Sequence, residues 1–422
     1  MDETNSKRLK TEGRICLLTS NFPRWDGDAT TPFVLHLAQD LIKLGWQVEV
    51  LAPHAPGAAR HEVLHGVPVW RFRYFWPESQ ETVCYRGGAL INLRKRPMNR
   101  LKIPALVSFE WLALMALLAR RRYVLINAHW ILPQGFVAVA AKWLFGTPVV
   151  ITVHGGDVFG LRGRLMAWFK RLALRRATAI TVNSSATEAA VLEIAPELRS
   201  IHRIPMGVSV PASPTEADAA TLRNRFRRGE GPLLVFVGRL VEEKGLSDLI
   251  RAVALLVAAL PDATATILGD GQDRADMEAL ASRLEISDRV HFLGWVEPGE
   301  VPAYLAAADI FVGPSKRAAN GWVEAQGLTF VEAMLARTPV IATRSGGIPD
   351  AVRHEETGLL VPEGRPDEIA AAIRRLVADP PLARRVTEAG YALANSAFNR
   401  ERSAGVFADL FDSLRTDSVE HR

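Results

Sequence analysis

The strongest constraint on the fold is a regular alternation of short apolar runs with longer segments of helical periodicity. An apolar run at residues 14–20 is followed by a helical pattern over 32–45 and by a second apolar run at 48–52. A strand, a helix and a strand in about forty residues are typical of a parallel sheet, because parallel strands need a crossover connection. The same alternation resumes after residue 232, so the sequence predicts two α/β domains.

Further elements follow from the same patterns. In the first half we predict strands at residues 67–73, 124–127, 149–153 and 179–182, with helices at 104–120, 136–144 and 165–176. In the second half we predict strands at residues 233–237, 264–268, 290–293, 310–312, 340–342 and 358–361, alternating with helices such as 246–260 and 331–335. Two doubly wound sheets imply a cleft, and ligands of such sheets bind at the carboxyl ends of the strands.

The predicted boundaries follow the composition of the connecting stretches. Residues 206–231 hold several Pro, Gly and Ser residues and no convincing strand, which indicates a linker. We therefore expect a flexible N-terminus (1–13), a first Rossmann-like domain (14–205), the linker (206–231), a second Rossmann-like domain (232–396), a C-terminal helix (397–414) and a tail (415–422). The C-terminal helix has no strand after it, and we expect it to pack across the domain boundary.

Composition narrows the class of protein. A chain of 422 residues is long enough for full hydrophobic cores, and two cysteines cannot build a disulfide framework or a four-thiolate metal site. The start, MDETNSKRLKTEGR, has no apolar core and does not resemble a signal peptide. We therefore expect a cytoplasmic protein.

Charge is distributed unevenly. Residues 1–210 carry 27 Lys and Arg against 15 Asp and Glu, a balance of +12, whereas the rest carry 24 against 31, a balance of −7. Ordinary solvated surface charge explains such a pattern, and so does a basic half that faces an anionic surface.

Two cations follow the strand at 233–237. Arg239 and Lys244 lie in the loop before a helix, next to free backbone N–H groups and the positive end of the helix dipole. This is how proteins hold a phosphate or a diphosphate, although two solvated cations on a surface loop fit the pattern as well. The loop is neither a GxGxxG motif nor a P-loop, which argues against a dehydrogenase and an NTPase.

Two carboxylates follow the strand at 310–312. Glu324 lies in the loop, and Glu332 lies eight residues later in the first turns of a helix. Carboxylates accept hydrogen bonds from vicinal hydroxyls, so this pair is suited to a polyol, while Gly327 permits close approach of the backbone to an anion. Glu332 also fits simple complementation of the helix dipole.

Two histidines end neighbouring strands of the first domain. His129 ends one strand and His154 follows the next, so both point toward the expected cleft. Their spacing matches no common zinc signature, and an isolated histidine is more often structural, so we expect no metal site.

The order and spacing of the motifs resemble glycosyltransferase family 4, the retaining nucleotide-sugar enzymes of the GT-B fold. The motifs are FPRWDGD, HGGD, VGRLVEEKG, LGDGQDR, FLGWV, EAQGLTFVEAM, TPVIAT, GGIPD and TGLLVP. Together they span residues 22–362, and the resemblance extends from about residue 15 to residue 414. The first loop departs from the family, which often has two glycines where this chain has Gly27 followed by Asp28.

The resemblance implies roles for individual residues. Arg239 and Lys244 would bind the donor diphosphate, Glu324 the donor sugar and Glu332 the ribose. His154 would contact the transferred sugar. The remaining donor-side residues are Gly27, Asp157, Gly271, Trp295, Val296, Gly327, Leu328 and Thr329, and His129 is placed on the acceptor side.

The implied activity is transfer of a hexose-type sugar from a nucleoside diphosphate, with retention of configuration and with neither metal nor other cofactor. Two alternatives stay open, a sugar-nucleotide epimerase and a glycosyltransferase with a soluble acceptor. A binding protein without catalysis is disfavoured by the four intact residues Arg239, Lys244, Glu324 and Glu332. The sequence does not specify the base, the sugar, the acceptor, the linkage or the oligomeric state.

Basic and apolar residues of the first half indicate the acceptor. A cation cluster at 94–102 precedes an apolar helix at 104–119, which Glu110 interrupts and which we expect to be too short to cross a bilayer. A second basic helix at 162–176 mixes six cations with Trp168, Phe169 and other apolar residues, as an interfacial helix does. We therefore expect a lipid-linked or polysaccharide-precursor glycan as acceptor, an anionic membrane surface as partner, and no nucleic acid. The simpler interpretation is that both helices only cover the sheet.

Overall fold

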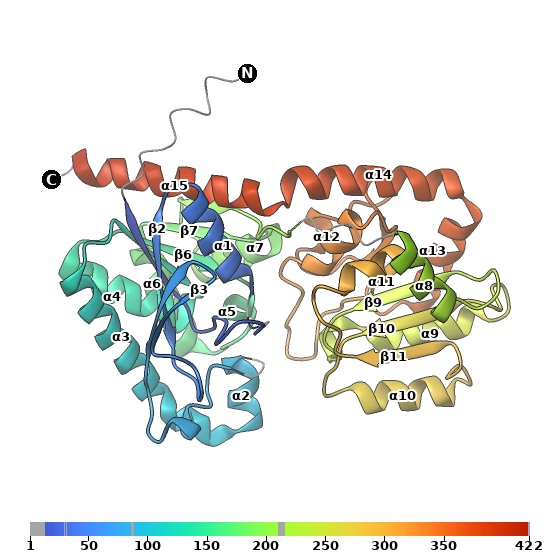
Figure 1. Cartoon of the computed structure of the whole chain (residues 1–422), viewed down its shortest axis with the longest axis horizontal. Helices are drawn as coiled ribbons and strands as arrows, with labels where there is room; N and C mark the ends of the chain where they lie inside the picture. Colours follow the sequence, from blue (N-terminus) through green and yellow to red (C-terminus); the bar gives the residue numbers. More distant parts are fainter. Residues whose placement is uncertain (1–12, 29, 31, 86–87, 210–215, 421–422) are drawn as a thin grey trace. The chain divides into compact units, whose positions relative to one another are not determined.

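The chain folds into two compact α/β units, as the alternating pattern predicts. The computed structural model describes residues 13–28, 30, 32–85, 88–209 and 216–420. One unit comprises Met1–Gly207 with Arg400–Arg422, and the other comprises Val208–Asn399. Each unit is built on a single sheet, of eight strands in the first and six in the second (Figure 1).

The first unit contains residues from both ends of the chain. Its elements are β1 (Arg14–Leu18), α1 (Pro32–Lys43), β2 (Gln47–Pro53), β3 (His61–Leu64), β4 (Val67–Phe72), α2 (Ala89–Lys95), α3 (Ile103–Arg120), β5 (Leu125–His129), α4 (Phe136–Phe145), β6 (Val149–Val153), α5 (Gly156–Phe159), α6 (Arg164–Arg176), β7 (Ala179–Val182), α7 (Ser185–Ile194), β8 (Ile201–Arg203) and α15 (Arg400–Glu420). Short 3₁₀ helices lie at Glu78–Gln80 and Pro97–Lys102, and a π-helical turn lies at Ile131–Gly135.

The central strand of this sheet is β1, and its position sets the location of the site. The strand order is β3-β4-β2-β1-β5-β6-β7-β8, with Ile15 paired to Val48 on one side and to Leu125 on the other. The chain runs outward in opposite directions from β1 and from β5. Right-handed crossovers therefore place α1 on one face of the sheet and α4 and α6 on the other. The order reverses between β1 and β5, where an open α/β sheet leaves a crevice at the carboxyl ends of the strands.

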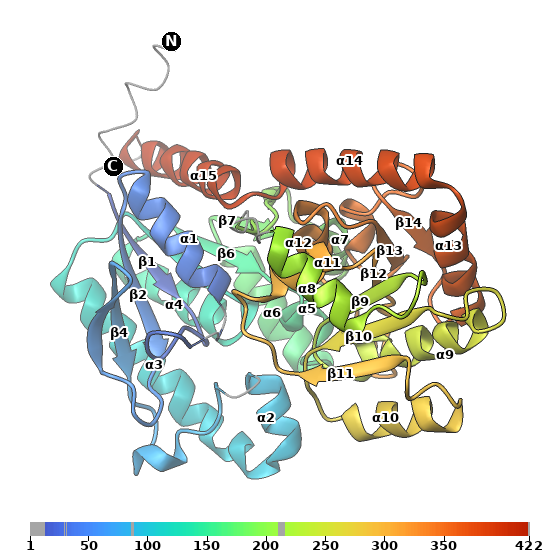
Figure 2. The ribbon, with the colours of Figure 1, turned by 45° about the vertical axis from the view of Figure 1, so that its right-hand side comes forward.

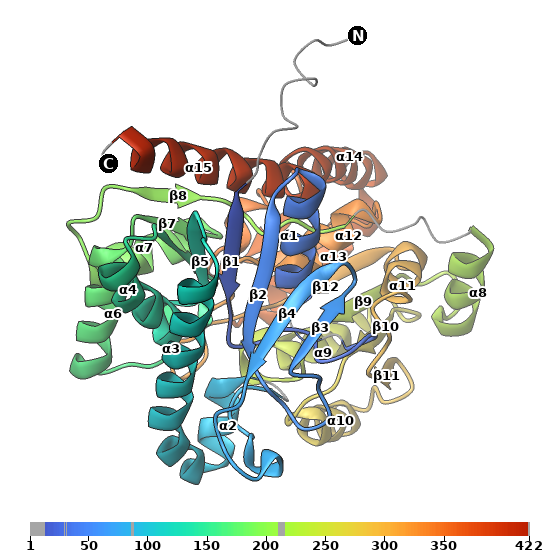
Figure 3. The same ribbon diagram turned by 60° about the vertical axis from the view of Figure 1, so that its left-hand side comes forward.

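Helices cover this sheet in two groups. Helices α3, α4 and α6 pack side by side in that order, and α1 packs against α15 (Figure 3). Arg400, at the start of α15, makes an ion pair with the buried Asp40 of α1 at 2.7 Å. That ion pair joins the C-terminal helix to the first unit.

The second unit repeats the same principle with six parallel strands. Its elements are α8 (Glu216–Phe226), β9 (Leu233–Val237), α9 (Leu246–Leu256), β10 (Thr264–Leu268), α10 (Arg274–Arg283), β11 (Val290–Gly294), α11 (Val301–Ala307), β12 (Ile310–Gly313), α12 (Leu328–Leu335), β13 (Val340–Thr343), β14 (Leu359–Val361), α13 (Pro366–Ala378) and α14 (Pro380–Ala397), with 3₁₀ turns at Glu242–Lys244 and Ile348–Asp350. The order is β11-β10-β9-β12-β13-β14, and the neighbouring strands β9, β10 and β11 are visible in Figure 2. The reversal here lies between β9 and β12, so the loops that leave these two strands meet at one place.

Four features of the fold differ from the sequence-based expectation. The expected linker contains helix α8, which packs on α11, while its residues 210–215 lie outside the described residues. The expected helix at 397–414 corresponds to α15 but begins at Arg400, because α14 ends at Ala397 and Val208 N–H donates to Phe398 O at 2.8 Å between the two helices. Helix α15 then continues to Glu420, into the expected tail. Strand β3, which pairs antiparallel with the predicted strand β4, was not predicted, because its four residues are too few to show a period.

Candidate active site

Lys244 and Glu324 meet at the reversal point of the second sheet. Lys244 ends the 3₁₀ turn in the loop after β9, and Glu324 lies in the loop after β12. Because β9 and β12 are neighbours, these loops leave the sheet side by side, and Lys244 Nζ lies 2.5 Å from Glu324 Oε2. The structure thus brings together two residues that are 80 positions apart in sequence.

Electrostatics keep Glu324 ionised. Only 8% of the residue is exposed, and burial alone would raise its pKa. The charge and the hydrogen bond of Lys244, with a further contribution from Arg239, outweigh burial and lower the pKa of this carboxyl. Glu324 is therefore a fixed anion beside two cations, oriented to accept hydrogen bonds from hydroxyl groups.

Arg239 lies on the same loop and is half-exposed. Its guanidinium is 3.7 Å from Glu243, too long for a strong pair, so the side chain can turn toward a ligand at low cost. The loop itself is held tightly, because Leu240 N–H donates to Asp270 O at 3.0 Å. Gly271 permits this contact, since a Cβ at this position would lie 2.2 Å from Leu240 O. Gly271 thus shapes the loop that carries Arg239.

Helix α12 adds a second anion-binding element. Gly327 precedes it with a φ of +79°, a conformation that glycine adopts without strain. Leu328 and Thr329 are the first two helical residues, so their backbone N–H groups have no partner within the helix. Glu332 follows one turn later, and burial raises its pKa while Lys244 opposes the shift.

Trp295 and Val296 directly follow β11, at the same edge of the second sheet. Trp295 has 62% of its surface exposed, and Val296 is half-buried. An exposed indole at the carboxyl end of a strand is suited to stacking on a planar ring. The structure therefore places the predicted donor-side residues of the second unit on loops that leave the carboxyl edge of its sheet or in the first turns of α12, which follows one of these loops.

In the first unit, His129 and His154 form one pair. His129 Nδ1 lies 2.9 Å from His154 Nε2, across the ends of β5 and β6. Burial lowers the pKa of His129 to about 3 and that of His154 well below its usual range, with the His129 charge opposing protonation further. Both rings are therefore neutral at pH 7.

Asp157 supports the turn that carries His154. Its carboxylate accepts hydrogen bonds from Ile131 N–H at 3.0 Å, Gly155 N–H at 2.9 Å and His154 N–H at 3.3 Å. Burial raises its pKa, and the Ile131 hydrogen bond is the largest opposing effect. With only 4% of the residue exposed, we assign Asp157 a structural role in the HGGD turn beside the expected donor contact.

Gly27 lies in a rigid loop after β1. Its φ is +81° and no atom lies within 4 Å of a Cβ built there, so its surroundings are open. Asp28 fixes the loop, accepting from Arg24 Nε at 2.7 Å and from Arg24 N–H at 2.9 Å. Asp28, which stands where the family often has a glycine, thus stabilises the loop through its hydrogen bonds with Arg24.

Two residues near the site were not predicted. Trp130 has a φ of +77°, which is rare for a bulky side chain and concentrates at functional sites, and its ring centroid is 5.0 Å from that of His154. Lys316 follows β12, and its N–H donates to Glu243 O at 2.9 Å beside a cavity of about 240 Å³. The position of Lys316 directly after a predicted strand could have indicated it, whereas no sequence pattern predicts the strained backbone of Trp130.

Family models cover both units. Residues 29–207 match a "Glycosyl transferase 4-like domain", and residues 219–393 match "Glycosyl transferases group 1". The chain belongs to glycosyltransferase family 4. It is a glycosyltransferase of the EC 2.4 type with the GT-B fold, as the resemblance predicted.

Curated relatives agree with this family. The glycosyltransferase is 32% identical to "2-deoxystreptamine glucosyltransferase" of Streptomyces kanamyceticus, over 88% of this chain and 96% of the relative. It is 33% identical to "GDP-mannose-dependent alpha-(1-6)-phosphatidylinositol monomannoside mannosyltransferase" of Mycobacterium tuberculosis, over 68% of this chain and 74% of the relative.

Solved structures share the fold. Sucrose-phosphate synthase from Thermosynechococcus elongatus has a TM-score of 0.78 at 25% identity, covering 96% of this chain and 100% of its own. Anabaena HepE in complex with UDP has a TM-score of 0.72 at 20% identity, covering 95% and 100%. The second likeness concerns the fold alone.

Proposed function

We propose that this glycosyltransferase moves a hexose-type sugar from a nucleoside-diphosphate sugar to a glycan acceptor, with retention of configuration. The observation that carries the proposal is the Lys244–Glu324 pair beside Arg239. It combines cations suited to a diphosphate with a buried carboxylate suited to sugar hydroxyls. Relatives named for GDP-mannose support a nucleotide-sugar donor.

The proposed mechanism follows the movement of charge. The bond between the sugar's anomeric carbon and the leaving phosphate oxygen breaks, and negative charge develops on that oxygen. Arg239, Lys244 and the first N–H groups of α12 stabilise this charge without requiring a metal. The acceptor oxygen attacks from the same face, and its proton passes to the departing phosphate.

Donor binding requires Lys244 to exchange partners. In the structure its ammonium is bound to Glu324, so a diphosphate must share or replace this contact. Glu324 then gains freedom to accept from the sugar hydroxyls. The ion pair therefore keeps both groups in position before the donor arrives.

The family assignment disfavours the epimerase alternative, and a direct test separates the two. Incubation with the donor alone gives an epimerised nucleotide sugar if the protein is an epimerase. A transferase under the same conditions gives only slow hydrolysis to the free sugar, with the anomer first released identifying retention or inversion. Appearance of an epimer contradicts the proposed transfer.

The acceptor side carries an uneven charge. Residues 88–178 contain 15 Lys and Arg but only two carboxylates, Glu110 and Asp157. Both carboxylates are buried, with exposures of 0% and 4%. The surface of this segment is therefore almost purely cationic, which attracts an anionic partner.

The same segment exposes large apolar side chains. Eight of the fifteen exposed large hydrophobic residues in the described part of the chain belong to it, and they are Met98, Leu101, Phe109, Leu112, Trp143, Leu144, Leu165 and Trp168. They come from α3, α4, α6 and the turn before α3, which pack consecutively. Tryptophan and arginine together are typical of surfaces that meet the headgroup region of a bilayer.

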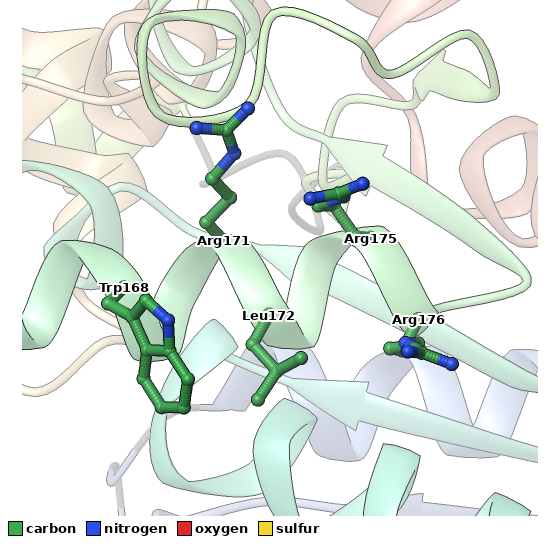
Figure 4. Close-up of a pocket in the computed structure, with 5 residues that line it drawn as sticks. All are labelled: Trp168, Arg171, Leu172, Arg175 and Arg176. Carbon is green, nitrogen blue, oxygen red and sulfur yellow. The ribbon is translucent and has the colours of Figure 1, made fainter.

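Figure 4 shows the cationic part of this surface on α6. Trp168, Leu172 and three of the four arginines of α6 (Arg171, Arg175 and Arg176) line a hollow of about 580 Å³. Arg176 lies over the ring of Trp143, 5.3 Å from its centroid, which joins α6 to α4. Glu197 pairs with Arg171 at 2.9 Å and with Arg175 at 3.1 Å, and so neutralises part of the charge.

The helical segment that contains α3 is longer than the sequence suggested. With the preceding 3₁₀ turn, α3 forms a segment of 24 residues, Pro97–Arg120, that is long and apolar enough to cross a membrane by length and composition alone. The expectation that it is too short is therefore wrong, because Pro97–Lys102 joins it. Glu110 on this helix is buried and accepts from Gln134 Nε2 at 3.0 Å, so one face is packed inside the unit. We propose that the other face lies in the membrane interface.

These features favour a lipid-linked glycan as acceptor over a soluble one. The names of the relatives include both kinds of acceptor, a phosphatidylinositol mannoside and 2-deoxystreptamine. A soluble acceptor leaves the cationic, tryptophan-bearing surface unexplained, whereas an acceptor in an anionic membrane uses it. The proposed location is accordingly the surface of a membrane.

Vesicle sedimentation tests the membrane proposal. Replacing Arg171, Arg175 and Arg176 with glutamine should lower partition into anionic vesicles by about tenfold or more, since each cation contributes about 1 kcal/mol. The matched control replaces Arg353, Arg374 and Arg375 in the second unit with glutamine. Equal partition of both triple variants and of the unaltered protein, or no binding to anionic vesicles at low salt, contradicts the proposal.

A further inference from the structure

The hydrogen bond between His129 and His154 lies in the plane of both rings. Their planes differ by 10°, and the centroids are 5.1 Å apart. With 2.9 Å between Nδ1 of His129 and Nε2 of His154, that separation is what two rings in edge-to-edge contact require. The lone pair of one nitrogen and the N–H of the other are therefore aligned, which is the strongest arrangement of such a bond.

Packing prevents His154 from leaving this arrangement. The Phe33 ring lies 4.9 Å away at 44°, and the Trp130 ring lies 5.0 Å away at 49°. Asp157 accepts from the backbone N–H groups of His154 and Gly155. The ring of His154 is thus fixed in position, and Nε2 is committed to His129.

The remaining nitrogens of the pair differ in their surroundings. His129 Nε2 is buried and finds no hydrogen-bond partner within the described part of the chain. His154 Nδ1 likewise makes no hydrogen bond there, but it is not among the buried unpaired atoms. Nδ1 of His154 is therefore the nitrogen of the pair that is open to a ligand.

One proton arrangement avoids a buried, unpaired donor. If His154 donated from Nε2, His129 would carry its proton on Nε2, where the N–H has no acceptor. If His129 donates from Nδ1, only a lone pair is left unmatched at its Nε2. Orphaned N–H groups are the rarer and costlier case in folded proteins.

We propose that His129 is a positioning residue, which donates from Nδ1 to His154 Nε2 and so holds His154 with its proton on Nδ1. His154 then presents an N–H donor, not an acceptor, to an oxygen of the transferred sugar. This role rests on the proposed function, in which His154 contacts that sugar. The tautomer itself is a property of the free protein.

Nitrogen-15 NMR of histidine-labelled protein without substrate tests the proposal directly, because protonated and unprotonated ring nitrogens resonate far apart. In the unaltered protein, His154 should show a protonated Nδ1 and an unprotonated Nε2. In His129→Phe, which keeps a ring but removes the donor, His154 should shift toward the other tautomer. In His129→Asn, whose amide nitrogen lies near the position of Nδ1, the original tautomer should persist.

Turnover provides a second readout. His129→Phe should lower kcat for donor hydrolysis by about 10- to 100-fold with little change in the donor KM, and His129→Asn should recover most of the loss. The matched control is His202→Asn on β8, which should change neither turnover nor the His154 signals. A proton on Nε2 of His154 in the unaltered protein, or an unchanged tautomer in His129→Phe, overturns the proposal.

The tautomer of His154 and the proposed function can be contradicted separately. If the tautomer is as proposed but no nucleotide sugar is turned over, the proposed function is wrong and the positioning role of His129 stands. Should His129→Phe fail to fold, the unaltered protein and His129→Asn still decide the tautomer.

Discussion

Replacing Glu110 with glutamine should remove a strong dependence of stability on pH. Glu110 lies on α3 with none of its surface exposed, and Gln134 Nε2 donates to its Oε1 at 3.0 Å. Its other oxygen, and Gln134 Oε1, have no partner within the described part of the chain. A proton on Glu110 would let the acid and the amide exchange two hydrogen bonds, which fits the buried pair better than a carboxylate does.

The size of this pH dependence follows from the difference between the pKa of Glu110 in the folded protein and in the unfolded chain. Burial raises the pKa of Glu110 from 4.5 to about 8, although the Gln134 hydrogen bond opposes the shift. Between these values the folded protein keeps a proton that the unfolded chain has lost, so the free energy of unfolding falls as pH rises. The loss begins above pH 4.5, is complete near pH 8, and totals about 3 to 5 kcal/mol at about 1.4 kcal/mol per pH unit.

Urea denaturation of the unaltered protein and of Glu110→Gln, each at pH 4.5, 6, 7 and 8.5, isolates this effect from other titrating groups. The difference in free energy of unfolding should be near zero at about pH 4.5 and reach about 3 to 5 kcal/mol in favour of the variant at about pH 8.5. Glu78→Gln, at an exposed position, is the control, and its free energy of unfolding should differ from that of the unaltered protein by the same amount at every pH. A difference for Glu110→Gln that is also independent of pH would refute the protonated carboxyl.

Three further predictions concern other parts of the fold. Glu324→Ala should lower turnover more than it lowers affinity for the free nucleoside diphosphate, whereas Glu332→Ala should weaken that affinity as well. Calorimetry measures the nucleotide affinity and steady-state kinetics the turnover, and equal effects of both variants on nucleotide affinity would contradict separate roles. Asp157→Asn should lower turnover by weakening three hydrogen bonds of the HGGD turn, with little effect on nucleotide affinity, and a loss confined to nucleotide affinity would instead favour direct donor contact. Arg400→Ala should lower the free energy of unfolding, measured by urea denaturation, by about 1 to 3 kcal/mol. It should also raise the pKa of His36, which burial and, to a smaller extent, Arg400 lower to about 4. An unchanged titration of His36 would contradict the contact between α15 and α1.

Most strands of the sheets, and the positions of most proposed donor-side residues in the fold, could be predicted because they depend on local patterns. Continuous apolar runs predict buried strands, and motifs between a strand and a helix lie at carboxyl ends in any parallel sheet. Lys244 and Glu324 were thus each expected on a loop at the carboxyl ends of strands in the second sheet. Their direct ion pair was not predicted, since it depends on the strand order that places β9 beside β12.

Other features depend on tertiary contacts that leave no local signal. The sequence shows Glu110 as an interruption of an apolar helix, whereas the structure buries it against Gln134, which lies 24 residues away. His129 and His154 were both expected at strand ends, but their edge-to-edge contact requires the register in which His129 pairs with Thr152. Helix α8 is weakly amphipathic and lies among turn residues, so nothing in its sequence separates it from a linker.

Calorimetric titration of nucleotide sugars into the unaltered protein, Arg239→Ala and Lys244→Ala tests the central claim most directly. We expect at least one UDP- or GDP-sugar to bind the unaltered protein, and each variant to lose about 1.5 to 3 kcal/mol, the value of a charge-assisted hydrogen bond. Lys95→Ala, at an exposed position in the first unit, should bind the donor unchanged. Donor affinities that are the same in both site variants as in the unaltered protein would contradict a diphosphate site at the carboxyl ends of β9 and β12.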